Sequence, residues 1–206
     1  MTEYTDRGRE LGLGNCAGKT RWAAGHLDDG LFIDVGAKIG AFFVPLLERT
    51  DARCLAFEPN PEAAALAREH ARMNGVYDRV EVFELALMDK PGSAVLHVPE
   101  KDGLSGFATI GCPLRAESKP VRVNVSTLGM YDAPDIALIK IDVEGAERYV
   151  IEGGRCLIEK HHPILIIECQ RANTRQFGYE PEVIEGMVSD MGYEWERSGN
   201  DILCVR

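Results

Sequence analysis

Long apolar runs, paired cysteines and a surplus of basic residues are all missing from this sequence of 206 residues. Because no 18 consecutive residues are apolar, the sequence predicts no membrane-spanning helix. The N-terminal residues include no apolar core segment, so we expect no secretory signal and a cytoplasmic location. The six cysteines form neither a C-x-x-C pair nor a zinc-like spacing with histidine, which indicates reduced thiols.

The charge balance is acidic, with 23 Lys and Arg residues against 33 Asp and Glu residues and a formal net charge of −10. An acidic surface repels the phosphates of nucleic acids and of anionic membranes, so we expect neither as the main partner. The length, together with a hydrophobic content of 45%, predicts a single globular domain.

Two regions of the chain differ from the rest in composition. Residues 1–29 are polar and glycine-rich, with Trp22 as the obvious apolar anchor, and we expect them to form a cap on a main domain at 30–206. A polar stretch at 99–120 is longer than a plain connection, which is typical of a lid or a wall for the substrate, and the alternative is a disordered surface loop. Its Ser105, Phe107 and Thr109 are candidates for binding a polyhydroxyl acceptor.

Short apolar runs alternate with helical patterns along the main domain. The runs predict buried strands at 31–35, 53–58, 80–85, 136–141 and 163–169, with further strands near 93–98 and 121–125. Helices are predicted at 39–49 (shortened or bent by Pro45), 61–74, 146–152 (ended by Gly153-Gly154) and 181–191. Segments 192–197 and 201–205 predict a closing hairpin linked by Ser198-Gly199-Asn200. This alternation predicts a doubly wound α/β fold, mostly parallel, with one antiparallel strand.

Acidic residues follow the predicted strands at the edge of the sheet where ligands bind in this architecture. They are Asp34, Glu58, Asp142, Glu144 and Glu168. In the first turn, DVGAKIG at 34–40, an acid replaces the first glycine of the G-x-G-x-x-G dinucleotide fingerprint. Its charge repels a pyrophosphate by about 4 kcal/mol per pair at about 4 Å and an effective dielectric of about 20. The turn therefore favours a sulfonium ligand such as S-adenosylmethionine, and an NAD-dependent oxidoreductase is the disfavoured alternative.

Four segments resemble the FkbM family of S-adenosylmethionine-dependent methyltransferases. They are FIDVGAKIG at 32–40, AFEPNP at 56–61, LIKIDVEGAE at 138–147 with VIEGG at 150–154, and PILIIE at 163–168. The resemblance implies a Rossmann-like class I methyltransferase with a seven-stranded sheet in the order 3-2-1-4-5-7-6. It also implies methyl transfer to a hydroxyl of a sugar, a glycolipid glycan or a polyketide-like small molecule. A module that binds the cofactor without catalysis is the remaining alternative.

The resemblance also implies a cofactor site. Its residues are Asp34, Gly36, Ala37, Gly40, Glu58, Pro59, Asn60, Ala86, Leu87 and Asp142. Glu58 lies where an acid accepts the ribose hydroxyls in dinucleotide folds, although Asp34 and Glu58 would also suit helix caps. The resemblance places Ala86 and Leu87 along the adenine, unless they are simply part of the core.

Candidate catalytic residues lie at the end of the 136–141 strand. Asp142 is the first candidate for removing the hydroxyl proton, and Glu144 is the second, as a base or as a ligand of the cofactor ammonium. Lys140 lies on the same strand face as Asp142, either in the catalytic group or in a structural ion pair with Asp142 or Glu168. Alternatively, Asp142 and Glu168 together hold Mg²⁺.

Lys38 departs from the family pattern, which usually has asparagine in the glycine turn. We expect its ammonium to point to solvent, and the alternatives are pairing with the cofactor carboxylate, Asp34 or Glu58. If the side chain occupies the cofactor space, the affinity for the cofactor is lowered.

Overall fold

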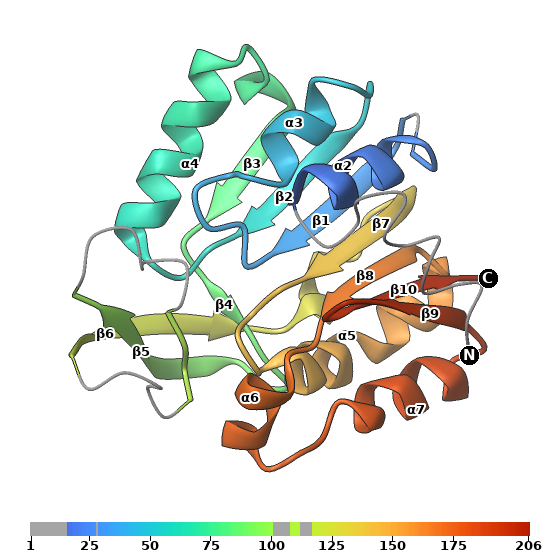
Figure 1. Cartoon of the computed structure of the whole chain (residues 1–206). Helices are drawn as coiled ribbons and strands as arrows, with labels where there is room; N and C mark the ends of the chain where they lie inside the picture. Colours follow the sequence, from blue (N-terminus) through green and yellow to red (C-terminus); the bar gives the residue numbers. More distant parts are fainter. Residues whose placement is uncertain (1–15, 28, 101–107, 112–116) are drawn as a thin grey trace.

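The computed structural model describes residues 16–27, 29–100, 108–111 and 117–206, and its centre is a seven-stranded sheet (Figure 1). The strand order is β3-β2-β1-β7-β8-β10-β9. These strands are β1 (Leu31–Val35), β2 (Arg53–Phe57), β3 (Val80–Phe83), β7 (Ile136–Ile141), β8 (Ile164–Glu168), β9 (Glu194–Ser198) and β10 (Asp201–Val205). Strand β10 runs antiparallel to both neighbours, and the other adjacent pairs are parallel. The predicted fold class, strand order and single antiparallel strand are confirmed.

Helices cover both faces of the sheet (Figure 1). One face carries α2 (Cys16–Ala24), α3 (Phe43–Leu47) and α4 (Pro61–Met73), and the other carries α5 (Glu147–His161) and α7 (Glu182–Asp190). Successive strand residues point to opposite faces, so Phe32 and Leu138 pack with the first group while Ile33 and Ile139 pack with the second. Among the described helices, none is long and apolar enough to cross a membrane.

Helix α4 begins and ends where the sequence predicts it. Pro61 occupies the first turn, where its missing N–H costs nothing, and the Asn60 side chain accepts a hydrogen bond from Glu62 N at 3.2 Å. At the other end, Asn74 is the C-cap and Gly75 follows with a φ of +69°. The prediction that Asn74-Gly75 ends this helix is confirmed.

The prediction that Gly153-Gly154 ends the next helix is wrong, because α5 continues to His161. These glycines serve close packing instead. A Cβ at Gly153 would lie 2.1 Å from the carbonyl oxygen of Met88, and one at Gly154 would lie 2.5 Å from Leu128 Cδ2. The missing side chains let the helix lie directly against the backbone beside the pocket described below.

Two smaller boundaries also differ from the prediction. The helix expected at 39–49 is confined to α3, since residues 38–42 form turns and Pro45 falls within the short helix. In the closing hairpin, Ser198 pairs with Asp201, so the link has two residues and not three. Gly199 supplies the positive φ of +66° that such a tight link requires.

A second, three-stranded sheet lies beside the carboxyl ends of the main strands (Figure 1). It consists of β4 (Ala86–Leu87), β5 (Gly92–Pro99) and β6 (Ser118–Ser126) in the order β4-β6-β5. Ala86, Leu96 and Val123 form its apolar cluster. Two short helices, α6 (Arg171–Thr174) and the 3₁₀ helix η4 (Arg175–Phe177), lie at the same end of the molecule, while η1 (Tyr77–Arg79) and η3 (Leu128–Tyr131) are further 3₁₀ turns. The sequence predicted β5 and β6 as strands but not as a separate sheet.

The packing role of Gly153 can be tested against a helical glycine with free space around it. Gly153→Ala forces a methyl group into the Met88 carbonyl and should lower the free energy of unfolding by about 2 kcal/mol or more. A Cβ at Gly186 in α7 has no neighbour within 4 Å, so Gly186→Ala should raise the free energy of unfolding by about 0.5–1 kcal/mol through its higher helix propensity. Urea denaturation of both variants measures the difference. A Gly153→Ala variant as stable as Gly186→Ala would show that α5 does not need the close approach.

Candidate functional site

The carboxyl ends of β1, β2 and β7 and the inner face of the small sheet together line a pocket. The lining residues are Val35, Gly36, Lys38, Phe57, Glu58, Pro59, Leu85, Ala86, Leu87, Leu96, Ala108, Ile110, Asp142, Val143, Glu144 and Ala146. One side of the pocket is apolar, and the other carries three carboxylates and one ammonium. This is the position in an open α/β sheet where ligands bind.

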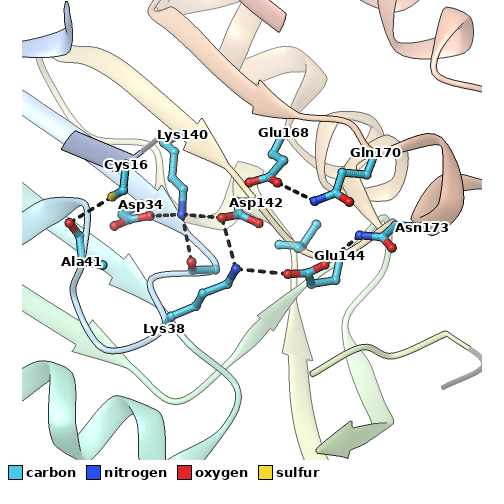
Figure 2. Close-up of polar contacts among 12 residues, drawn as sticks. Cys16, Asp34, Lys38, Ala41, Lys140, Asp142, Glu144, Glu168, Gln170 and Asn173 are labelled. Carbon is cyan, nitrogen blue, oxygen red and sulfur yellow. Dashed lines mark hydrogen bonds and ion pairs between the residues drawn. The ribbon is translucent and has the colours of Figure 1, made fainter. Parts of the chain in front are cut away.

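Behind the pocket, Lys140 ties the ends of β1 and β7 together (Figure 2). Lys140 is the register partner of Asp34, and its Nζ lies 3.0 Å from Asp34 Oδ1 and 3.5 Å from Asp142 Oδ2. The same ammonium donates a hydrogen bond to the carbonyl oxygen of Gly36 at 2.9 Å. Burial opposes the charge of Lys140, but Asp34 and Asp142 raise its pKa above the ordinary value. The ammonium therefore stays protonated and fixes the glycine turn.

The glycine turn passes very close to the end of β7. Gly36 has a φ of +79°, and a Cβ there would lie 1.8 Å from the carbonyl oxygen of Asp142. Asp142 N in turn donates to the carbonyl oxygen of Val35 at 2.9 Å. Gly36 is therefore required by both its backbone conformation and the close approach of the two strand exits.

The Lys38 ammonium bridges the two carboxylates that follow β7 (Figure 2). Its Nζ lies 3.0 Å from Glu144 Oε1 and 3.4 Å from Asp142 Oδ2. Burial acts to raise the pKa of Asp142, but the charges of Lys140, Lys38 and Lys19 outweigh it and lower that pKa to about 2. Burial raises the pKa of Glu144, which Lys38 only partly offsets. Asp142 is thus the weaker proton acceptor of the pair.

Glu58 closes the pocket at the end of β2. Its Oε2 accepts a hydrogen bond from Lys38 N at 2.8 Å, and its Oε1 accepts one from Asn60 N at 2.9 Å. Burial raises its pKa, and these two backbone donors oppose the rise. Beside Glu58, Phe57 stacks on Phe83 with ring centroids 5.0 Å apart, which fixes the apolar wall.

The turn at 143–145 is held by a buried carboxylate to which the sequence analysis assigned no role. Glu144 has a φ of +56°, and its Oε2 accepts a hydrogen bond from Asn173 Nδ2 at 2.7 Å. Glu147 Oε1 accepts from Gly145 N at 2.9 Å, and Glu147 Oε2 accepts from the Tyr179 hydroxyl at 3.0 Å. Burial raises the pKa of Glu147 to about 7. The available signal was an acid in the first helical turn after a tight turn.

Seven of the residues predicted to form the site line the pocket. They are Gly36, Glu58, Pro59, Ala86, Leu87, Asp142 and Glu144. The structure places the other five behind it. Asp34 is fully buried against Lys140, Ala37 packs in the core, Gly40 lies against Phe43, and Asn60 caps α4. The Asp34 carboxylate therefore does not serve as a helix cap. It pairs with Lys140, which in turn holds the glycine turn.

The Lys140 prediction is confirmed in part, and the Lys38 prediction is wrong. The expected ion pair of Lys140 with Asp142 is present at 3.5 Å, but Lys140 lies closer to Asp34, at 3.0 Å, because the parallel register places these two residues side by side. Lys38 was expected in solvent, or paired with Asp34 or Glu58. It pairs with Asp142 and Glu144 instead, because its left-handed backbone, with a φ of +52°, turns the side chain toward β7.

Leu96 of β5, and Ala108 and Ile110 on either side of Thr109, line the pocket although the sequence did not predict them there. Thr109 pairs with His97 through two backbone hydrogen bonds of 2.8 and 3.2 Å, and its hydroxyl donates to the carbonyl oxygen of Glu144 at 3.2 Å. Thr109 thus joins the small sheet to the acidic side of the pocket. The other acceptor candidates, Ser105 and Phe107, lie outside the described residues.

The Glu168 carboxylate is engaged by neighbouring side chains at the far edge of the site (Figure 2). Gln170 Nε2 donates to it at 2.8 Å, and Lys19 Nζ of α2 lies 3.5 Å from it and 3.0 Å from Asp201. Within the described ranges, no group of three or more His, Cys, Asp or Glu residues is arranged to hold a metal ion. The Mg²⁺ alternative between Asp142 and Glu168 gains no support from this arrangement.

A family model and a curated protein both match this chain. The family model described as the methyltransferase FkbM domain matches residues 34–195. The 2-O-methyltransferase NoeI of Sinorhizobium fredii is 31% identical over 152 residues, which are 64% of this chain and 60% of NoeI. The chain therefore spans about three fifths of the length of this curated relative.

Solved structures show the same fold at low identity. Methyltransferase FkbM from Methylobacillus flagellatus superimposes with a TM-score of 0.60 at 16% identity, over 87% of this chain and 44% of that one. A putative rRNA-methylase from Clostridium thermocellum superimposes with a TM-score of 0.58 at 10% identity, over 92% and 93% of the two chains. The strand order is that of the Rossmann-like class I methyltransferase fold. This chain belongs to the FkbM methyltransferase family, and the predicted resemblance is confirmed.

Titration of Glu147 makes the stability of the fold depend on pH, and the substitution Glu147→Gln should remove this dependence. Its pKa is about 7 when folded against an ordinary value of 4.5, so the folded chain keeps a proton that the unfolded chain releases in this range. This group therefore lowers stability as the pH rises from about 5 to 8. As the pH rises from about 5 to 8, the free energy of unfolding of Glu147→Gln should increase by on the order of 3 kcal/mol relative to that of the wild type.

Urea denaturation at pH 5 and pH 8 measures this difference between the two proteins. Glu159→Gln, on the exposed side of the same helix, is the matched control and should show none of the pH-dependent gain. An equal stability difference between Glu147→Gln and the wild type at both pH values would contradict the buried titration.

Proposed function

We propose that this chain binds S-adenosylmethionine in the pocket and transfers its methyl group to a hydroxyl oxygen of a small molecule. The single observation that carries the proposal is that Glu58, Asp142 and Glu144 line one pocket at the carboxyl ends of β2 and β7. Three carboxylates against the one ammonium of Lys38 favour a cationic ligand. Membership of the FkbM family supports the same activity, as does the name 2-O-methyltransferase of the relative NoeI.

The residues present fit this cofactor. Glu58 has lone pairs left after accepting its two backbone hydrogen bonds, so it can also accept the two ribose hydroxyls. Phe57, Leu85 and Leu87 provide an apolar wall suited to the adenine. Asp142 and Glu144 are placed to hold a positively charged amino acid portion. Asp34 and Lys140 act behind the pocket, where they fix the turn around Gly36.

The cofactor, when bound, supplies a methyl group already activated on a sulfonium. The protein's task is to align the acceptor oxygen, which alone can account for about 7–11 kcal/mol of the barrier, and to take the hydroxyl proton. With its pKa at about 2, Asp142 is suited to accepting a hydrogen bond that orients the hydroxyl. Glu144, whose pKa is raised by burial, is suited to removing the proton. In this proposal the two candidates for the base exchange the order predicted from the sequence.

The acceptor belongs to the class of sugars, glycolipid glycans or polyketide-like molecules in this proposal. The net charge of −10 disfavours a nucleic acid, and the similarity to an rRNA-methylase is a similarity of fold. Family membership argues against the NAD-dependent oxidoreductase considered above. A module that binds the cofactor without catalysis is separated from an enzyme by the experiment that follows.

Methyl transfer is tested by incubating the protein with S-adenosylmethionine and a panel of hydroxylated glycans and polyketides, with mass spectrometry of the products. The wild type should add one methyl group to at least one compound. Glu144→Gln should lower kcat by on the order of 100-fold, since it removes the proposed base. Glu69→Gln, an exposed acid on α4, should leave kcat unchanged. Cofactor binding with no methylated product from the wild type would favour the non-catalytic alternative.

The role of Glu58 is tested by binding alone. Glu58→Gln removes the charge that strengthens hydrogen bonds to the ribose and should weaken binding of S-adenosylhomocysteine by about 10- to 100-fold. Titration calorimetry measures the affinity, and Glu69→Gln again serves as the control. An unchanged dissociation constant for Glu58→Gln would remove Glu58 from the cofactor site.

A further inference from the structure

Lys38 reaches the pocket from a backbone conformation that side-chain-bearing residues seldom adopt. Its φ is +52°, and its N–H donates to Glu58 Oε2 at 2.8 Å. The backbone of Lys38 is therefore fixed by the carboxylate that closes the pocket at β2. From that fixed point the side chain extends across the pocket to the carboxylates after β7 (Figure 2).

The Lys38 ammonium is surrounded by more negative charge than it neutralises. Its Nζ contacts both Glu144, at 3.0 Å, and Asp142, at 3.4 Å, so one positive charge faces two negative charges. Lys140 also approaches Asp142, at 3.5 Å, but its charge is balanced by the closer Asp34. The cluster therefore attracts a ligand ammonium and repels a ligand carboxylate.

We propose that the Lys38 ammonium holds the position that the ammonium of the methyl donor takes on binding, so that the donor displaces it. This inference rests on the proposed function. The two lysines differ in their freedom to move, since the Lys38 side chain is 32% exposed and that of Lys140 is 7% exposed. The flexible four-carbon stem lets the Lys38 ammonium swing into solvent while the backbone stays bound to Glu58. Lys38 thus acts as a specificity determinant, because only a cationic ligand can displace its ammonium from the two carboxylates.

An internal competitor of this kind lowers the apparent affinity of the ligand. The dissociation constant rises by the reciprocal of the fraction of time for which the site is open. A bridge formed for about nine tenths of the time weakens binding about tenfold. The effect applies to ligands that present an ammonium to Asp142 and Glu144, and not to the nucleoside portion near Glu58.

The experiment compares two nucleosides by titration calorimetry. S-adenosylhomocysteine carries an ammonium and a carboxylate, whereas methylthioadenosine keeps the nucleoside and the thioether and has neither charge. Lys38→Met removes the ammonium and keeps the stem, and should bind S-adenosylhomocysteine about tenfold more tightly with no change for methylthioadenosine. Lys38→Asn should behave in the same way and tolerates the left-handed backbone better, which protects the test against misfolding. Lys90→Met, at a lysine whose side chain is 86% exposed, is the control and should change neither affinity.

Three results would overturn the proposal. Weaker binding of S-adenosylhomocysteine alone by both Lys38 variants would show that Lys38 holds the ligand carboxylate. Equal changes for both nucleosides would show an effect of pocket shape, and unchanged affinities would show no competition. Failure of the proposed function is recognised separately, because the wild type would then bind neither nucleoside.

Discussion

The buried ion pair between Lys140 and Asp34 is the interaction on which the rest of the site depends. A fully buried ammonium is tolerated only when a carboxylate and further acceptors surround it, and breaking such a pair costs about 3–5 kcal/mol. Here the acceptors are Asp34, the carbonyl oxygen of Gly36 and Asp142. The pair therefore locks together the exits of two central strands. The pocket wall formed by Gly36 and Asp142 has a fixed shape because of what lies behind it.

Two buried acids near this pair show how differently the protein treats carboxylates that are close in sequence. Lysines surround Asp142, and its pKa falls to about 2. Glu147 lies five positions later, where its close donors are the neutral backbone N–H groups of Val143 and Gly145 and the Tyr179 hydroxyl, and its pKa rises to about 7. Cations stabilise the ionised form far more than neutral donors do, which explains the contrast. The first acid serves the pocket by its permanent charge, and the second supports the adjoining turn by its hydrogen bonds.

The sheet could be predicted from the sequence because its strands are short apolar runs separated by helical patterns, and the acids that follow them must share one edge. Contacts between distant segments could not be predicted. In the sequence, Gly153 predicts the end of a helix. Only the position of the Met88 carbonyl oxygen, 2.1 Å from where a Cβ would lie, shows that the glycine is needed for packing. The partners of Lys38 depend on one left-handed φ angle. Asp34 has the residue type of a ligand contact, but its register with Lys140 turns it inward.

The small sheet of β4, β5 and β6 has an apolar cluster of its own, separate from the clusters on the two faces of the main sheet. It enters the chain as one continuous insertion between β3 and β7. Evolution can therefore remodel this wall without disturbing the layers that hold Glu58 and Asp142. The shape of this wall can diverge while the opposite half of the pocket stays the same, and the two ends of the insertion mark natural boundaries for exchanging it between homologues.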